Sequence, residues 1–277
     1  MTIDVPGFHR TTLTFDDATI EAGVQKTRDV YRRGDDGPAV IVMSEVPGIT
    51  PQVATFARTV ADAGFSVYMP QLFGTPMRPL SPLAMASTLS SVCIHREFSL
   101  FASDESSPIV EWLRALARHA HGECGGSGVG AVGMCLTGNF ALGMMLGAPV
   151  IGAVLSQPSL PLGLTSRQRE GLHASTEALD AAREKIANGG ARVLGLRFHG
   201  DPMCPGKRFA KLRKELGEGF EGIELAASTA NPRANKPAHS VLTNHLIDEA
   251  GEPTRAALDR TLAFLKERLV PTEQATV

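Results

Sequence analysis

Residues Val132-Gly133-Met134-Cys135-Leu136-Thr137-Gly138-Asn139 place a cysteine in a short stretch that has a glycine on either side. We interpret the stretch as a nucleophile elbow of the G-x-[Ser/Cys]-x-G type, in which a strand turns sharply into a helix and carries the nucleophile at the turn. The two glycines are expected where side chains would collide with neighbouring backbone. The stretch therefore predicts a strand before Cys135, a helix after it, and an enzyme whose catalytic partners come later in the chain.

The rest of the chain alternates short apolar or β-branched runs with helical patterns, which is typical of a mostly parallel sheet flanked by helices on both faces. An antiparallel pair is expected at 11–15 and 22–31, and further strands at 39–43, 65–69, 129–134, 150–155, 192–198 and 222–225. Helices are expected at 55–63, 108–120, 174–188, 205–216 and 254–269, together with one that follows Cys135 and ends before Gly147. The predicted fold class is α/β, with three layers.

Length and charge limit the organisation and the partners. With 277 residues, of which 43% are hydrophobic, we expect one domain over residues 1–277, in which the irregular segments at about 74–107 and 158–190 form lids or insertions over a site. The net charge of −2 gives no electrostatic reason for binding nucleic acid or an anionic membrane. We expect a small-molecule substrate, and the sequence leaves the oligomeric state open.

The N-terminus lacks the pattern of a signal peptide, and no apolar run approaches the length of a membrane span. We therefore expect a cytoplasmic protein, in which the four irregularly spaced cysteines stay free thiols. No metal is expected, because His119 and His121 would diverge on a helix and Cys124 brings no fourth ligand. No cofactor is expected either: residues 128–133 match the dinucleotide pattern G-x-G-x-x-G, but they lie within the expected strand and the acidic ribose partner is missing.

Asp201 and His239 are the residues that we expect to act with Cys135. Ligands of open α/β sheets sit at the carboxyl ends of the strands; Asp201 follows the strand expected at 192–198, and His239 lies in the long loop before the last helix. His239 would accept and return the proton, Asp201 would orient its imidazole, and the backbone N–H of Leu136 would help to bind the oxyanion.

Other interpretations of these residues stay open. A buried cysteine is commonly a core residue, and an Asp before a proline, as at Asp201, commonly begins a turn. Two histidines compete with His239 for the role of base: His199 lies only two residues before Asp201, and His245 would need a longer loop. We favour His239, because the long irregular loop before a final helix is where such a histidine is placed.

With these residues placed, the chain resembles the dienelactone hydrolase family, in which a cysteine nucleophile is followed by an Asp and then a His. Residues 42–48, Val-Met-Ser-Glu-Val-Pro-Gly, are similar to the strand-end motif of that family that carries a glutamate, here Glu45. The resemblance implies an α/β-hydrolase fold. It also implies that Glu45 interacts with the Cys135 thiol and helps to deprotonate it on substrate binding, and that the N–H of Val46 joins that of Leu136 as oxyanion donor.

The chain departs from the family at a position that bears on the substrate. Family members that act on dienelactone bind its carboxylate with arginines, one of them four residues after the catalytic histidine, where this chain has Thr243. Arg78 or Arg96 could still meet an anionic substrate, although such arginines are more often solvated surface side chains. The segment 158–188 is also longer than the usual connection in the family, so we expect a different pocket wall.

The sequence thus predicts a hydrolase that cleaves a lactone or small activated ester through a thioacyl-enzyme intermediate. A thioesterase would use the same residues. An α/β-hydrolase scaffold without catalytic activity, which binds a ligand or senses oxidants through Cys135, is the alternative from a different class.

Overall fold

A single sheet of eight strands organises the chain in the computed structural model, which describes residues 3–16, 26–81, 108–159 and 170–271. The strand order is β1-β2-β4-β3-β5-β6-β7-β8; β1 and β2 run antiparallel to their neighbours, and all the other neighbouring pairs are parallel. The strands are β1 His9–Thr14, β2 Thr27–Arg33, β3 Ala39–Met43, β4 Ser66–Pro70, β5 Val129–Met134, β6 Val150–Ser156, β7 Arg192–Phe198 and β8 Phe220–Leu225.

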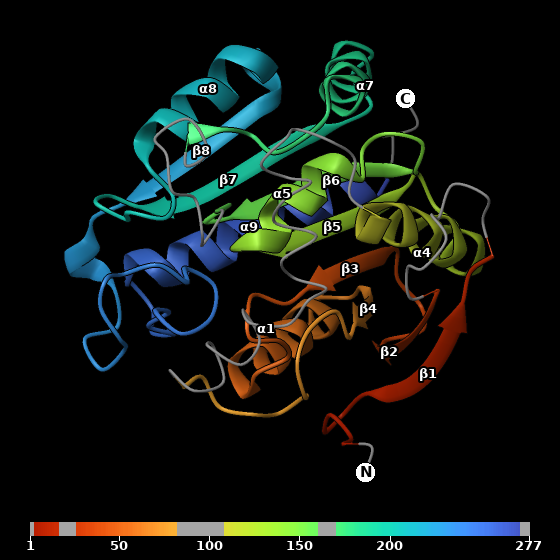
Figure 1. Cartoon of the computed structure of the whole chain (residues 1–277), viewed down its shortest axis with the longest axis horizontal. Helices are drawn as coiled ribbons and strands as arrows, with labels where there is room; N and C mark the ends of the chain where they lie inside the picture. Colours follow the sequence, from red (N-terminus) through yellow and green to blue (C-terminus); the bar gives the residue numbers. More distant parts are fainter. Residues whose placement is uncertain (1–2, 17–25, 82–107, 160–169, 272–277) are drawn as a thin grey trace, which may run out of the picture.

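Helices cover both faces of this sheet, so the molecule has the three layers expected of an α/β fold (Figure 1). The described helices are α1 Pro51–Asp62, α4 Pro108–Cys124, α5 Leu136–Gly143, α7 Thr176–Ala187, α8 Gly206–Leu216 and α9 Pro253–Leu269, with short 3-10 turns η1 Gly217–Gly219 and η2 Ala227–Thr229. Apolar side chains of α4, α5, α7 and α8 share one core, and those of α1 and α9 share the other.

Successive side chains of the central strands point alternately to the two faces of the sheet, and they contribute in this way to both cores. In β3, Ile41 and Met43 pack on the side of α4 and α5, whereas Val40 and Val42 pack on the side of α1 and α9. Successive side chains of a strand point to opposite faces, so a strand that is apolar throughout must be covered on both sides. The uninterrupted apolar run of β3 therefore fixes its place in the middle of the sheet.

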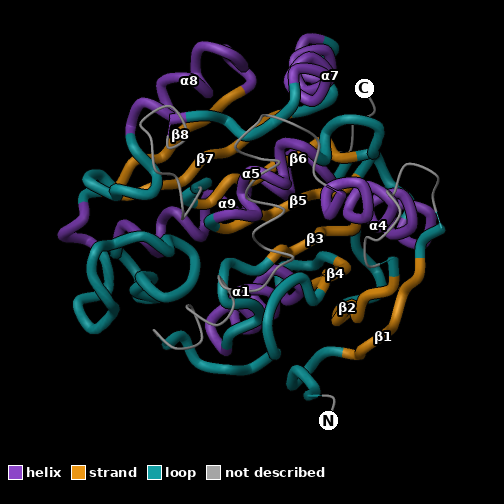
Figure 2. The backbone as a smooth tube through the Cα atoms, in the orientation of Figure 1, coloured by secondary structure: helices purple, strands orange, loops and turns teal. Residues whose placement is uncertain are grey.

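The parallel strands end at one edge of the sheet, and the long loop between η2 and α9 lies there, at the left of Figure 2. Residues 44–50 after β3, 135 after β5, 156–159 after β6, 199–205 after β7 and the loop before α9 belong to this edge. Since ligands bind at the carboxyl ends of parallel strands, the edge is where a site is expected.

The predicted strands at 39–43, 129–134 and 192–198 have the observed bounds, but several helix ends differ. Helix α1 begins four residues before the expected start, because the Thr50 hydroxyl caps it by accepting a hydrogen bond from the Val53 N–H at 3.2 Å. Helix α4 continues to Cys124 and stops at Gly125, which has a φ of +67°. Helix α5 ends at Gly143, and the residues after it form tighter turns, so the expected extension to Gly147 was wrong. The part of the first expected hairpin at 22–25 lies outside the described residues.

Within the described part of the chain, no helix has the length and apolar character needed to cross a membrane. The cytoplasmic location stays a prediction.

Gly133 in β5 decides whether the chain can turn back into α5. A Cβ atom there would lie 2.0 Å from the carbonyl oxygen of Thr137, which is far inside van der Waals contact. Because both groups belong to the backbone of one sharp turn, neither can move away without opening the turn. Only glycine fits at this point.

We therefore expect Gly133→Ala to lower the free energy of unfolding by about 1–3 kcal/mol or more, as overpacking does. The matched control is Gly122→Ala in the exposed last turns of α4, where an added Cβ meets nothing within 4 Å. That substitution should raise the free energy of unfolding by about 0.5–1 kcal/mol, because alanine is the better helix former. Urea unfolding measures both, and equal midpoints for the two variants would contradict this account of the turn.

Candidate active site

Cys135 sits at the sharp turn between β5 and α5, as the elbow interpretation expects. Its φ of 57° and ψ of −120° are unusual for a residue with a side chain. The backbone is held there by a hydrogen bond from the Cys135 N–H to the Ser156 carbonyl oxygen at 3.0 Å. The residue is 5% exposed. The strained turn thus presents the thiol at the carboxyl edge of the sheet.

One detail of the elbow interpretation was wrong. The second glycine of G-x-C-x-G would stand at position 137, which is Thr137, and the glycine comes one residue later, at Gly138. The Thr137 hydroxyl accepts a hydrogen bond from the Met134 N–H at 2.8 Å and lies 3.1 Å from the Met43 carbonyl oxygen, to which it can donate. Thr137 therefore ties the elbow to the end of β3. Gly138 is needed instead because its Cβ would lie 2.9 Å from the Cα of Pro158.

Asp201 and His239 are brought together across the edge of the sheet. Asp201 follows β7 and His239 lies in the loop before α9, and both are buried. His239 Nδ1 donates to Asp201 Oδ2 at 2.6 Å, while Oδ1 accepts from the Met203 N–H at 2.9 Å. The carboxylate thus fixes the ring so that the proton sits on Nδ1 and Nε2 is left for the reaction.

Three effects act on the pKa of His239. Burial lowers it, but the hydrogen bond to Asp201 and the neighbouring Cys135 sulfur outweigh burial and raise the pKa to about 10. Nε2 is buried and makes no hydrogen bond of regular geometry with any described residue, so the thiol beside it is the group with which it can exchange a proton. The imidazole is therefore suited to hold a proton next to an ionised sulfur.

Glu45 lies at the end of β3, buried, but its partners are not those that the resemblance implies. Its Oε2 accepts from the Ser240 hydroxyl at 2.6 Å, and its Oε1 accepts from the Thr243 hydroxyl at 2.5 Å. The Gln157 side-chain amide adds a longer contact of 3.4 Å to Oε2. Among the hydrogen bonds of the described residues, none joins Glu45 to Cys135. The carboxylate is thus held towards the loop that carries His239.

The two expected oxyanion donors follow neighbouring strands, Val46 after β3 and Leu136 after β5. Leu136 is the first residue of α5, where an N–H has no acceptor inside the helix. Val46 follows Glu45 and precedes Pro47, and no described residue accepts a hydrogen bond from its N–H. Both donors are therefore free to bind an oxygen that carries negative charge.

Residues after β6 form a wall of the site that the sequence interpretation missed. The Ser159 hydroxyl donates to Cys135 Sγ at 3.0 Å. Gln157, with a φ of 37°, turns its side chain so that Oε1 accepts from the Val241 N–H at 3.2 Å. Arg208 of α8 is fully buried and donates to the Pro158 carbonyl oxygen at 2.5 Å. The polar run Ser-Gln-Pro-Ser at 156–159, directly after the strand expected at 150–155, was the available signal in the sequence, because ligands bind at the carboxyl ends of parallel strands.

The competing histidines have other positions. His199 is exposed in the turn after β7. His245 is buried; its Nδ1 accepts from the Ser240 N–H at 3.1 Å and its Nε2 lies 2.6 Å from the Asn235 carbonyl oxygen. Burial lowers the pKa of His245, which fits a neutral ring that braces the loop around His239.

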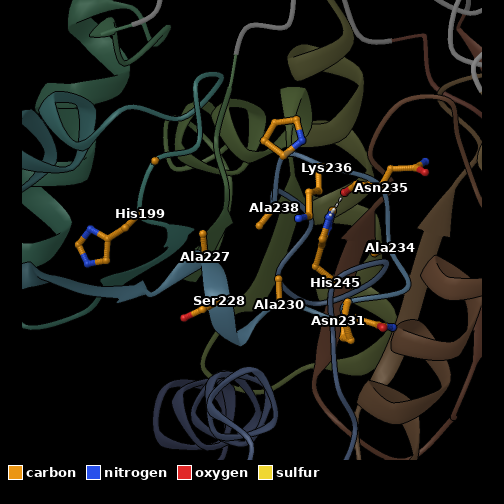
Figure 3. Close-up of a pocket in the computed structure, with 13 residues that line it drawn as sticks. His199, Ala227, Ser228, Ala230, Asn231, Ala234, Asn235, Lys236, Ala238 and His245 are labelled. Atoms are coloured by element: carbon orange, nitrogen blue, oxygen red, sulfur yellow. Dashed lines mark hydrogen bonds between the residues drawn. The ribbon is translucent and has the colours of Figure 1, made fainter.

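A cavity of about 430 Å³ adjoins the acid and histidine loops (Figure 3). Its lining includes Gly200 and Ala238, which directly precede Asp201 and His239, and also His245 with the Asn235 that it contacts. Cys135 does not line this cavity. The cavity therefore lies beside the loops that carry the acid and the histidine, apart from the nucleophile.

The two arginines predicted to bind substrate differ in whether the structure describes them. Arg78 is exposed in the segment after β4, and Arg96 lies outside the described residues. No group of three or more His, Cys, Asp or Glu side chains that could hold a metal ion occurs in the described part of the chain.

An eight-stranded sheet with a strained cysteine elbow, and an Asp–His pair on later strand ends, defines the class of α/β-hydrolases. The sequence model of the dienelactone hydrolase family matches residues 28–216. Since this match covers more than half of the chain, the protein belongs to the dienelactone hydrolase family, which is a family of hydrolases. A search of curated proteins finds no match.

Solved structures of similar proteins agree with the fold. A putative dienelactone hydrolase from Klebsiella pneumoniae is 17% identical with a TM-score of 0.59, and the match covers 94% of this chain and 99% of the other. A dienelactone hydrolase-like promiscuous phosphotriesterase from metagenomic libraries is 17% identical with a TM-score of 0.57, over 94% and 98%. A cold-adapted esterase from an Arctic intertidal metagenomic library is 12% identical with a TM-score of 0.57, over 95% of each chain. At such identities the likeness concerns the fold.

The contact between Asp201 and His239 predicts how the imidazole titrates. In Asp201→Asn the pKa of His239 should fall from its raised value towards or below the ordinary 6.5. Burial lowers this pKa, and the variant loses the carboxylate that opposes the effect of burial. In the wild type the folded state holds this proton more tightly than the unfolded state does. The resulting stability should be fully present below pH 6.5 and be lost as the pH rises towards 10.

Histidine ring resonances in NMR, assigned with His239→Gln, measure this pKa. Asp248→Asn is the control, since Asp248 pairs with Arg255 at the surface and should leave the titration of His239 unchanged. An unchanged pKa in Asp201→Asn would show that Asp201 does not set the charge of the ring.

Proposed function

We propose that this protein hydrolyses a lactone or small activated ester, with Cys135 as nucleophile and a thioacyl-enzyme as intermediate. The observation that carries the proposal is the geometry around Cys135: a strained turn holds the thiol beside a buried histidine that is hydrogen-bonded to Asp201 at 2.6 Å. A core cysteine needs neither the strained backbone nor the charged pair. Family membership supports the same class of chemistry.

In the proposed reaction, the proton of the Cys135 thiol passes to His239 Nε2, and Sγ attacks the carbonyl carbon of the ester. The C–S bond forms while the negative charge moves from the sulfur to the carbonyl oxygen. The N–H groups of Val46 and Leu136 bind that oxyanion. The tetrahedral intermediate then expels the alkoxide, which takes the proton from His239 Nε2. In the second half, His239 takes a proton from water, the hydroxide attacks the thioester, and the C–S bond breaks. Asp201 accepts a hydrogen bond from the Nδ1–H of His239 throughout.

The role of Glu45 in this proposal comes from the family resemblance, in which the carboxylate helps to deprotonate the thiol on substrate binding. To reach Cys135, the carboxylate would have to leave the hydroxyls of Ser240 and Thr243. Breaking two hydrogen bonds to a buried charge is costly, at roughly 1.5–3 kcal/mol each, so substrate binding would need to provide that energy. We propose Glu45 as a catalytic residue on this condition.

The substrate that we propose is a small molecule without an obligatory carboxylate. Thr243 stands where family members that act on dienelactone carry an arginine, and its hydroxyl is occupied by Glu45. Arg78 and Arg96 remain proposed contacts for an anionic substrate. A thioester would follow the same steps, so a thioesterase is the second candidate; the chemistry at Cys135 does not separate the two.

Turnover of p-nitrophenyl acetate and of a small lactone panel tests the proposal. We expect Cys135→Ala and His239→Ala to lower kcat by about a thousandfold or more, as in other enzymes that lose a nucleophile or its base. Cys135→Ser should retain at most a small part of the activity, because the hydroxyl is far harder to ionise than the thiol.

Cys124→Ala is the matched control. Cys124 is the last residue of α4 and lies 3.5 Å from the Tyr68 hydroxyl, and its loss should leave kcat within about twofold. Activity that persists in Cys135→Ala would rule out the cysteine mechanism. A wild type that turns over none of the esters, lactones or thioesters, yet is oxidised rapidly by peroxide at Cys135, would support the sensing scaffold instead.

A further inference from the structure

Among the residues that the structure describes, Ser159 donates a hydrogen bond from its hydroxyl directly to the sulfur of Cys135. The distance from Ser159 Oγ to Cys135 Sγ is 3.0 Å, and the side chain of Ser159 is fully buried. A neutral thiol sulfur is a weak acceptor, whereas hydrogen bonds to an ionised acceptor are shorter and about twice as strong. A buried hydroxyl aimed at this sulfur therefore favours the thiolate over the thiol.

The backbone holds Ser159 in this position from both sides. Its N–H donates to the Cys135 carbonyl oxygen at 3.0 Å, and its carbonyl oxygen accepts from the side-chain amide of Asn139 at 2.9 Å. The preceding residue, Pro158, packs against Gly138 and accepts from Arg208. Both ends of the hydroxyl-to-sulfur contact thus belong to one rigid unit that joins the ends of β5 and β6.

Several charged or titratable groups face the sulfur from the surrounding elements. His239, from the loop before α9, and the buried guanidinium of Arg208, from α8, favour the thiolate electrostatically. Asp201 and Glu45 oppose it, but Asp201 is paired with His239 and Glu45 is held by Ser240 and Thr243. Cys204, also buried nearby, has its pKa raised by burial to about 12 and stays neutral. Cationic and anionic groups thus both surround the sulfur, and the hydroxyl of Ser159 adds a hydrogen-bond donor that carries no charge.

We infer that Ser159 is a catalytic residue whose hydroxyl stabilises the Cys135 thiolate relative to the neutral thiol, by a hydrogen bond to the sulfur. The inference rests on the proposed role of Cys135 as nucleophile, and it adds Ser159 to the residues that activate the thiol.

The same hydroxyl acts in both halves of the reaction. When Sγ forms the bond to the carbonyl carbon, the sulfur loses its charge and the hydrogen bond from Ser159 weakens. When water has added and the C–S bond breaks, the electron pair returns to Sγ and the hydrogen bond re-forms. Ser159 gives up no proton; the proton transfers remain with His239.

The test is the pH dependence of alkylation of Cys135 by iodoacetamide, without substrate, in the full-length protein. In Ser159→Ala the profile should move to higher pH. The alkylation rate should fall about tenfold or more at mildly acidic pH and should meet the wild-type rate at high pH, since a hydrogen bond to a charged group is worth about a tenfold change or more.

Two further variants separate a hydrogen bond from a packing effect. Ser159→Thr keeps the hydroxyl and should restore the wild-type profile. Ser66→Ala removes another buried serine hydroxyl, in β4, that has no hydrogen-bond partner in the described part of the chain, and it should leave the profile unchanged.

A Ser159→Ala profile that overlays the wild type would overturn the inference, as would a loss of reactivity that is equal at every pH. If Ser159→Ala does not fold, Ser159→Gly takes its place, because it also removes the hydroxyl, and the same two outcomes would overturn the inference. Failure of the proposed function would be seen separately. In that case Ser159→Ala would still shift the alkylation profile, but ester turnover would persist in Cys135→Ala.

Discussion

The strained backbone at Cys135 is the constraint on which the other features of the site depend. A residue with a side chain at a φ of 57° and a ψ of −120° costs of order 1–3 kcal/mol, and it persists only where the surroundings hold it. Here the Cys135 N–H donates to Ser156, the last residue of β6, and the Cys135 carbonyl oxygen accepts from Ser159 in the segment after it. Thr137 ties the same turn to β3. The ends of three neighbouring strands are thereby fixed around one sulfur atom.

Asp201 and Glu45 are both buried at the carboxyl ends of the strands, but their hydrogen-bond partners differ, and this difference gives them different chemical roles. Asp201 faces an ionisable ring, so its charge changes the pKa of His239. Glu45 faces hydroxyl and amide donors, which satisfy the carboxylate without taking part in proton transfer. A buried carboxylate that loses such donors is left poorly solvated. The loop that holds His239 is therefore braced by Glu45 through Ser240 and Thr243, in addition to His245.

The sequence was informative wherever local pattern decides structure. The apolar runs at 39–43, 129–134 and 192–198 gave strands with the observed bounds, and the order Cys135, Asp201, His239 indicated which strand ends meet. Contacts between distant segments could not be derived in the same way. The hydrogen bond of Thr243 to Glu45 joins residues 198 positions apart, and nothing local to either residue indicates it.

Ser159 and Thr137 show two further limits of predicting the site from the sequence. Ser159 reaches the sulfur only because Gly138 lets Pro158 approach the elbow, which is a property of packing. Thr137 was overlooked because the elbow pattern places a glycine at that position; the structure shows instead a hydroxyl that replaces the close approach with hydrogen bonds. The helix ends were misplaced where a cap decides them, as with Thr50 at the start of α1.

The central claim is that Cys135 forms a covalent bond to the acyl group. It is tested most directly by mixing the protein with p-nitrophenyl acetate, quenching in acid during turnover, and locating the added mass by intact and peptide mass spectrometry. The account predicts one acetyl group, on the peptide that contains Cys135 and on its sulfur. An acetyl group carried by another residue, or steady turnover during which Cys135 remains unmodified and open to alkylation, would contradict it.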